Sequence, residues 1–239
     1  MATRKKLRKD QLSKLGVDVL SDLLIEEASR NASLKQRLVI LLASEEGPDA
    51  VAKEVRKRIA AIARSTSFID WKGIKKFEQD LQMPLDAIVR QIAPVDPEQA
   101  LELMWRFLDV SELCLNRCDD SSGVIGGIFR DAVDWLGDIA DNHPSLSDTF
   151  VDDVFERLQT NNYGIYDDLL TSVYPALNAE CAAHLKQRLM DWHAAAMRGA
   201  DPRQMGATAA ILGLQSLADA QGDVDLFIET HDEKSLRNP

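Results

Sequence analysis

The feature that most constrains the fold of this chain is the spacing of its apolar residues, which recur every three or four positions along almost the whole sequence. Val17, Leu20, Leu24 and Ala28 follow this spacing, and later segments repeat it. Such a period places the apolar side chains on one face of an α-helix. No segment of useful length alternates apolar and polar residues as a strand does. The sequence therefore predicts an all-α protein.

Several of the expected helices begin at recognisable capping residues. Asp96-Pro97 and Asp201-Pro202 each offer an N-cap carboxylate followed by proline at the first helical position, and Asp223 offers a further cap. We expect about eleven helices with short connections, as is usual for antiparallel neighbours. Their expected ranges are 17–29, 33–44, 50–64, 70–83, 97–117, 124–141, 146–159, 165–177, 179–198, 203–220 and a last helix from 223.

The segment 97–117 differs from the others because its polar residues occupy one narrow stripe. Almost every other position in it is apolar, including Trp105 and Phe107. A helix with so little polar surface must be packed on three sides. We therefore expect one continuous central helix here, with a single exposed stripe made of Glu98, Glu102, Arg106, Asp109, Glu112 and Asn116.

Consecutive helices with short connections favour antiparallel pairs stacked into an α-solenoid-like array of the tetratricopeptide or HEAT kind, or else an irregular helical bundle. The Asp-Pro helix starts at 96 and 201 lie 105 residues apart. This separation is near three tetratricopeptide units of about 34 residues. We expect a basic, disordered tail over 1–12 and one helical domain over 13–239, with a soft boundary near 94–96.

Charge is unevenly distributed along the chain, whose net charge is −11. Residues 1–90 hold 18 Lys and Arg against 13 Asp and Glu, whereas residues 91–239 hold 10 against 26. Such a chain can pair its charges internally, associate with itself as a homo-oligomer, or offer its basic end to an acidic partner. No apolar run approaches the roughly 20 residues of a membrane span, and the N-terminus lacks a secretory pattern. We expect no membrane contact and a cytoplasmic location.

Three segments resemble a bacterial, all-helical family that is known only as a domain of unknown function. They are "FIDW" at 68–71, "LMWRFLDVSELCLNRCDDSSGVIGGIFRDAVDWLG" at 103–137 and "NNYGIYDDLL" at 161–170. Some members of this family are joined to a SWIM-type zinc finger, and relatives continue with further helical repeats. The resemblance implies a helical architecture and no particular chemistry. It also implies that this chain is either a short member or a shortened form of a longer array.

The stretch "CDDSSGVIGGIF" lies where the helix over 97–117 ends and the next one begins. Asp119, Asp120, Ser121 and Ser122 are good N-cap residues. Gly126 and Gly127 would then let the new helix press against a neighbour. The rival interpretation is a loop in which the two aspartates bind a cation or a peptide amine. A phosphate site is disfavoured because the aspartates would repel it and no P-loop lysine follows.

The stretch "NNYGIYDD" contains the asparagines and glycine that suit a turn. In one interpretation Tyr163 and Tyr166 pack this turn against the fold. In the other the turn is a recognition loop, since tyrosine is enriched at interfaces. We therefore take Tyr163 and Tyr166, together with Asp119, Asp120, Ser121 and Ser122, as candidate partner-binding residues.

The cysteines and histidines give little sign of metal binding or catalysis. Cys114, Cys118 and Cys181 are odd in number and widely spaced, which favours reduced thiols in the core. With His184 they could formally make a Cys₃His zinc site, but no short Cys-x-x-Cys knuckle is present. We expect no bound metal or cofactor, and no catalytic residue is assigned because nucleophile-elbow and metalloprotease motifs are missing.

These observations favour a non-enzymatic helical module that presents its surface to a protein or peptide partner. One alternative is a nucleic-acid-associated accessory protein that uses the basic N-terminal third, including the run "RKKLRK" at 4–9. A second alternative is a hydrolase whose catalytic pair is brought together across helices.

Overall fold

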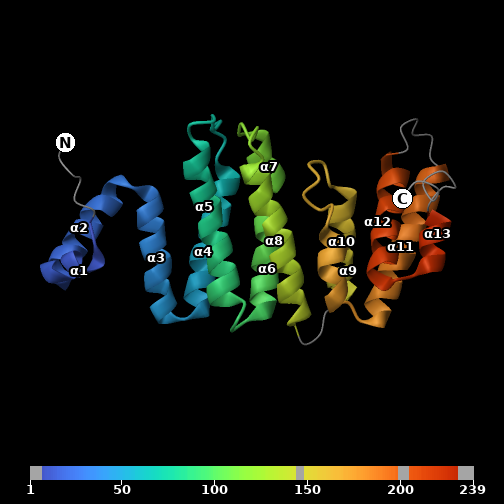
Figure 1. Ribbon diagram of the computed structural model, residues 1–239, viewed down its shortest axis with the longest axis horizontal. Coiled ribbons are helices and arrows are strands. Elements are labelled where there is room, and N and C mark those ends of the chain that lie inside the picture. The colour runs from blue at the N-terminus through green and yellow to red at the C-terminus, as the bar shows by residue number, and fades with distance from the viewer. Residues whose placement is uncertain (1–6, 144–147, 199–204, 231–239) are drawn as a thin grey trace.

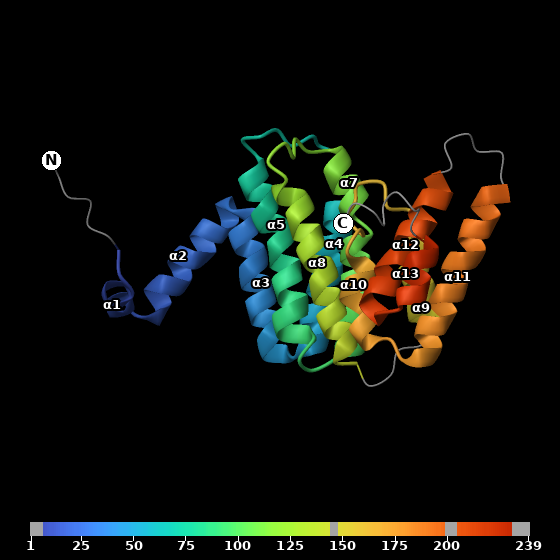
Figure 2. The same ribbon diagram turned by 45° about the vertical axis from the view of Figure 1, so that its right-hand side comes forward.

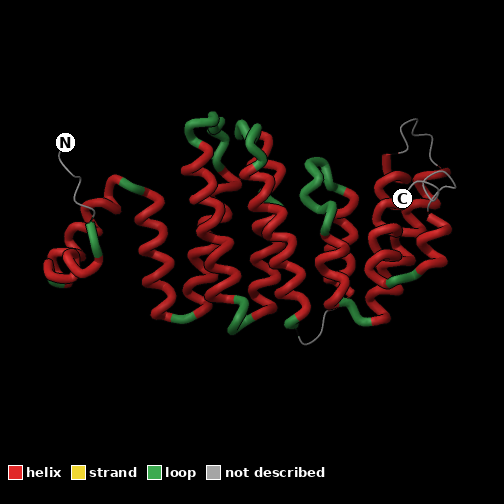
Figure 3. Tube along the Cα trace, viewed as in Figure 1, coloured by secondary structure: helices red, strands yellow, loops and turns green. Residues whose placement is uncertain are grey.

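The protein is all-α, as the sequence predicts. The computed structural model describes residues 7–143, 148–198 and 205–230, and no strand occurs among them. Figure 3 shows helices joined by loops, and within the described residues an isolated bridge between Ile69 and Cys118 is the one β-type pairing. The helices and helical turns are α1 (Lys9–Leu12), η1 (Ser13–Leu15), α2 (Val17–Arg30), α3 (Ala32–Glu46), α4 (Pro48–Arg64), α5 (Ile74–Ala87), η2 (Ile88–Ile92), α6 (Pro97–Leu108), α7 (Ser111–Asn116), α8 (Val124–Asp141), α9 (Asp148–Gln159), α10 (Leu169–Val173), η3 (Tyr174–Ala176), α11 (Ala179–Arg198), α12 (Met205–Gln221) and α13 (Val224–Thr230).

The helices stand side by side in a row along the longest axis of the molecule (Figure 1). The contacts between them sort the helices into two layers. In one layer α3, α5, α8, α10 and α12 each pack against the next, and in the other α4 packs against α6 and α9 packs against α11. Contacts such as those of α3 with α4, α6 with α8, and α11 with α12 join the two layers. Because each helix touches mainly its neighbours, the two ends of the row lie far apart.

Aromatic side chains join neighbouring helices in the core. The rings of Phe107 on α6 and Phe129 on α8 lie 5.1 Å apart, and both are fully buried. Trp105 on α6 contacts Phe150 on α9 at 5.9 Å between ring centroids. The buried apolar residues form one cluster from α3 to α12, so the core runs without a break past residues 94–96.

The predicted central helix over 97–117 is wrong in one respect, because the chain leaves the helix at Asp109 and Val110. Two shorter helices, α6 and α7, take its place. Val110 lies at φ −89° and ψ 0°, and its side chain is buried. The exposed polar residues keep the same spacing on both sides of this break, so the spacing of the apolar residues did not reveal it. The predicted burial is confirmed for α6, of whose twelve residues seven are buried, but Leu113 on α7 is 51% exposed although it lies outside the predicted stripe.

Two other predicted helices have different bounds in the structure. The segment 70–83 becomes helical only at Ile74, and Trp71 lies outside α5 with 69% of its surface exposed. The segment 165–177 contains only the short α10, followed by the turn η3, in which Pro175 lies. In both cases a loop takes residues that the apolar spacing had assigned to a helix.

The structure confirms two of the three predicted caps. The Asp96 carboxylate accepts a hydrogen bond of 2.9 Å from the backbone N–H of Gln99, and Asp223 accepts one of 3.0 Å from that of Leu226. Asp201-Pro202 lies outside the described residues, as do residues 1–6 of the predicted tail; Lys9–Leu12 form α1. None of the described helices combines the length and apolar character needed to cross a bilayer.

The glycines that permit close packing are not the two predicted. A Cβ added at Gly127 would meet nothing within 4 Å, and one at Gly126 would first meet the flexible side chains of Arg130 and Asp120. The prediction that both glycines press against a neighbouring helix is therefore wrong. Farther along α8, a Cβ at Gly137 would lie 2.2 Å from the carbonyl oxygen of Ser172 on α10. Gly137 is thus the residue that lets α8 and α10 approach closely.

Candidate functional site

A loop from each of the three segments that carry the family resemblance lies at the same edge of the molecule. The loops over 65–73, 117–123 and 160–168 each join two helices, and all three lie at the upper edge in Figure 1. Figure 3 shows them as the loops at that edge, next to the short helix α7. We call these three loops together with α7 the loop edge. Motifs that are far apart in sequence are therefore brought together in space.

Backbone hydrogen bonds join the first two loops. The N–H of Ile69 donates to the carbonyl of Arg117 at 2.8 Å, and the N–H of Asp119 donates to the carbonyl of Ile69 at 2.9 Å. The Arg117 guanidinium also donates to the carbonyl of Ser67 and lies 4.6 Å from the centroid of the Phe77 ring. These contacts hold the "FIDW" loop in one position relative to α7.

Asp120 caps α8, as one of the two sequence interpretations proposed. Its carboxylate accepts hydrogen bonds of 2.9 Å and 2.8 Å from the backbone N–H groups of Ile125 and Gly126. Asp119 accepts a weaker bond of 3.3 Å from the N–H of Ser121. Ser121 and Ser122 are exposed. The two carboxylates therefore differ in their partners, because only the Asp120 carboxylate accepts hydrogen bonds from the first turn of α8.

Replacing Asp120 with alanine is expected to lower the free energy of unfolding by about 1–2 kcal/mol, because two N–H groups at the start of α8 lose their acceptor. Ser122→Ala is the matched control, since its side chain is exposed, and its effect should stay within about 0.5 kcal/mol. Urea unfolding followed by circular dichroism measures both. Equal stabilities for the two variants would show that Asp120 is not a structural cap.

The third loop is attached to α7 by side chains. The Tyr163 hydroxyl donates to Oδ1 of Asn116, and the Asn162 amide lies 3.4 Å from both carboxylate oxygens of Glu112. Asn161 accepts a hydrogen bond of 3.0 Å from the N–H of Tyr166. The loops over 65–73 and 160–168 are therefore both attached to α7 or to Arg117, the residue that follows it.

The two candidate tyrosines occupy different environments. Tyr166 is buried, and burial raises the pKa of its hydroxyl to about 12. Tyr163 keeps 45% of its surface exposed. Tyr166 therefore packs the turn against the fold, as one interpretation of "NNYGIYDD" proposed, whereas Tyr163 is available at the surface.

The largest exposed side chains of the loop edge are ones that the sequence did not single out as site residues. Phe68 and Trp71 are 68% and 69% exposed, and Leu113 on α7 is 51% exposed. A hollow of about 550 Å³ lies beside Phe68 and is also lined by Lys76 and Phe77. The signal in the sequence was the "FIDW" motif itself, but the apolar spacing assigned Trp71 to a buried stripe.

Positive charge surrounds these aromatic residues. Lys72, Lys75 and Lys76 lie in the loop and in the first turn of α5, and no salt bridge to them occurs within the described residues. The Lys72 ammonium lies 5.3 Å from the centroid of the Trp71 ring. The nearby carboxylate of Asp70 instead accepts two backbone N–H groups of its own loop. Lysines thus lie near Phe68 and Trp71, whereas the loops over 117–123 and 160–168 carry the carboxylates of Asp119, Asp120, Asp167 and Asp168.

The cysteines are placed as core residues. Cys114 is fully buried, and burial raises the pKa of its thiol to about 11; burial also raises the pKa of Cys118. Cys181 and His184 belong to α11 rather than to α7. Within the described ranges no three His, Cys, Asp or Glu side chains are grouped so that they could hold a metal ion. The thiols are therefore protonated at neutral pH and poorly suited to act as nucleophiles.

Comparison with known proteins assigns the chain to a family. Neither the curated proteins nor the solved structures include a match to this chain. A family model described as "Family of unknown function (DUF6880)" matches residues 2–239. The chain therefore belongs to this family of unknown function.

Proposed function

We propose that the protein is a non-enzymatic interaction module whose loop edge binds a partner protein. The observation that carries this proposal is the exposure of Phe68 and Trp71, which keep about two thirds of their surface in solvent. Leaving such large apolar side chains in water forfeits the free energy that their burial would provide. Exposed apolar patches rimmed by polar residues are typical of binding surfaces.

The way in which the loops are held supports the same function. Phe68 and Trp71 flank Ile69, whose backbone N–H and carbonyl are both hydrogen-bonded to the segment after α7. A side chain on a fixed loop loses less conformational freedom on binding than one on a free loop. Tryptophan is also among the residues that contribute most to protein–protein affinity. Helical arrays commonly bind partners through such extended surfaces.

The lysines beside the FIDW loop favour a partner that presents acidic residues next to an apolar one at this part of the loop edge. Lys72 lies in that loop and Lys75 and Lys76 lie in the first turn of α5, and complementary charge accelerates and orients association. The partner segment would place an apolar side chain against Phe68 and Trp71 and carboxylates against the lysines. Tyr163, Ser121 and Ser122 remain candidates for the polar rim of this interface.

A nucleic-acid partner is less favoured because part of the basic N-terminal third is already paired. Arg56 contacts Glu102 at 2.7 Å, Lys57 contacts Glu54 at 2.5 Å, and Arg58 contacts Asp80 at 2.9 Å. Phosphate binding depends on cationic side chains that are free to replace counterions. A hydrolase is less favoured because the buried cysteine thiols have raised pKa values.

Affinity purification with the tagged chain tests the proposal. We expect the wild-type chain to recover a partner from cell extract at least about tenfold more than Trp71→Ala does, because a central tryptophan is removed. Trp135→Ala on α8 is the control, since Trp135 is also exposed (43%) but lies outside the loop edge. Recovery that nuclease abolishes, or that Trp71→Ala leaves unchanged, would contradict a protein-binding loop edge.

A further inference from the structure

The N-terminal helix α2 has no packed face. It contains 14 residues, and none of them is buried. Val17 and Ile25 are 79% and 69% exposed, although both are strongly apolar. Figures 1 and 2 show α2 extending away from the row of helices, so that it forms an open V with α3. A helix of this length is marginal in water unless its apolar face is covered.

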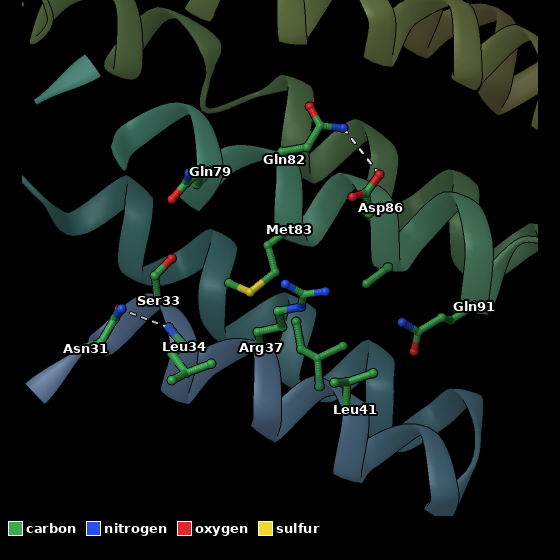
Figure 4. Close-up of a pocket in the computed structure, with 12 residues that line it drawn as sticks. Asn31, Ser33, Leu34, Arg37, Leu41, Gln79, Gln82, Met83, Asp86 and Gln91 are labelled. Carbon is green, nitrogen blue, oxygen red and sulfur yellow. Dashed lines mark hydrogen bonds between the residues drawn. The ribbon is translucent and has the colours of Figure 1, made fainter. Parts of the chain in front are cut away.

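A groove lies on the other side of α3. It has a volume of about 590 Å³ and runs between α3 on one side and α5 with η2 on the other. Its apolar lining includes Leu34, Leu41 and Met83, and Leu41 remains 50% exposed. Figure 4 shows the side chains of Arg37 from α3 and Met83 from α5 reaching into the space between the two helices. Polar side chains, among them Gln82 and Gln91, also line the groove. An apolar helix face and a groove with an apolar strip are therefore both uncovered at the same end of the molecule.

The charges of this helix and this groove are complementary. Helix α2 carries Asp18, Asp22, Glu26 and Glu27 against a single basic residue, Arg30. Glu26 and Arg30 pair with each other, whereas Asp18, Asp22 and Glu27 make no ion pair within the described ranges. In the groove, Arg37 of α3 is likewise without an ion-pair partner among those residues, whereas the carboxylate of Asp86, which also lines the groove, lies 3.6 Å from the guanidinium of Arg90.

The connection between α2 and α3 keeps α2 away from the groove of its own chain. The connection is the single residue Asn31, whose side chain caps α3 by accepting a hydrogen bond of 3.1 Å from the N–H of Leu34. Gly47 is likewise the single residue between two helices, α3 and α4, and these two helices do pack against each other. The φ angle of Gly47, however, is +116°. That conformation is disfavoured for other residues, and Asn31 lies at φ −125°.

We propose that α2 of one chain docks in the α3–α5 groove of a second copy, while α2 of the second copy docks in the groove of the first. Each copy contributes the same helix and the same groove, so the contact is two-fold symmetric and closes as a dimer. The apolar side of α2 would cover Leu34, Leu41 and Met83, and its carboxylates would face Arg37. This inference does not depend on the function proposed for the loop edge.

Sedimentation velocity of the complete chain tests the dimer. The wild-type chain should be dimeric, and Leu24→Asp, which puts a charge on the apolar side of α2, should raise the dimer dissociation constant at least about tenfold. Met190→Asp is the matched control, because Met190 on α11 is as exposed (44%) as Leu24 (43%). A monomeric wild-type chain, an open polymer, or equal effects of both variants would overturn the proposal.

A charge exchange identifies the second copy as the occupant. Asp22→Lys and Arg37→Glu should each weaken self-association about tenfold, since each juxtaposes like charges. In an equal mixture of the two variants, both grooves of a mixed dimer regain opposite charges, so association should return to within about twofold of the wild type. No recovery in the mixture would show that α2 does not lie in the groove of another copy. Circular dichroism of each variant confirms that the fold is intact.

Discussion

Gly137→Ala is expected to destabilise the fold by about 3 kcal/mol or more. The added Cβ would lie 2.2 Å from the carbonyl oxygen and 2.6 Å from the carbonyl carbon of Ser172. Both atoms are backbone atoms of α10, so the clash is relieved only by moving one helix away from the other. Urea unfolding followed by circular dichroism should show a clearly lower midpoint for this variant.

Gly127→Ala provides the matched control in the same helix. A Cβ at this position would meet nothing within 4 Å. Alanine loses less conformational entropy than glycine when a helix forms, so this variant should be more stable than the wild type by about 0.5–1 kcal/mol. Similar midpoints for Gly137→Ala and Gly127→Ala would mean that α8 and α10 are not packed as closely as described.

Phe107→Ala is expected to lower the free energy of unfolding by about 3–5 kcal/mol. Phe107 is fully buried near the C-terminal end of α6 and contacts the ring of Phe129 on α8. Its removal leaves a cavity in the part of the core that joins the two layers. Phe68→Ala removes the same side chain at an exposed position, and its effect on stability should stay within about 0.5 kcal/mol.

The same pair of variants separates stability from binding. Phe68→Ala should reduce partner recovery without changing the unfolding midpoint, because Phe68 belongs to the loop edge. Phe107→Ala should lower the midpoint strongly. A loss of stability in Phe68→Ala that equals the loss in Phe107→Ala would show that Phe68 is a core residue and not a binding residue.

Local patterns in the sequence predicted the parts of the fold that depend on local physics. The apolar spacing predicted the all-α class, and Asp96 and Asp223 were predicted as caps because a cap bonds only to residues three positions away. The break after Leu108 and the close contact of Gly137 with Ser172 were missed. The Gly137 contact joins two helices that are distant in the sequence, and helical periodicity carries no information about such contacts. The break leaves the spacing of the exposed polar residues unchanged, so periodicity does not reveal it either.

The candidate site was predicted only in part for the same reason. Asp120 was one of four cap candidates, with Asp119, Ser121 and Ser122, before a glycine-rich helix start, and its carboxylate is the one that accepts from the first turn of α8. Trp71 was assigned to the core because its spacing from Ile74 and Phe77 suits a helix, yet the helix begins at Ile74. The bonds of Ile69 to the segment after α7 hold this loop outside the helix, and that pairing spans almost fifty residues.

Photo-crosslinking from the loop edge tests most directly the claim that its three loops form one protein-binding surface. A photoreactive residue would replace Phe68, Ser122 or Tyr163, one in each loop, and Trp135 would be the control position. We predict that all three positions of the loop edge crosslink to the same partner protein and that position 135 does not. Different partners at the three positions, or a partner captured equally well from position 135, would contradict the proposed function.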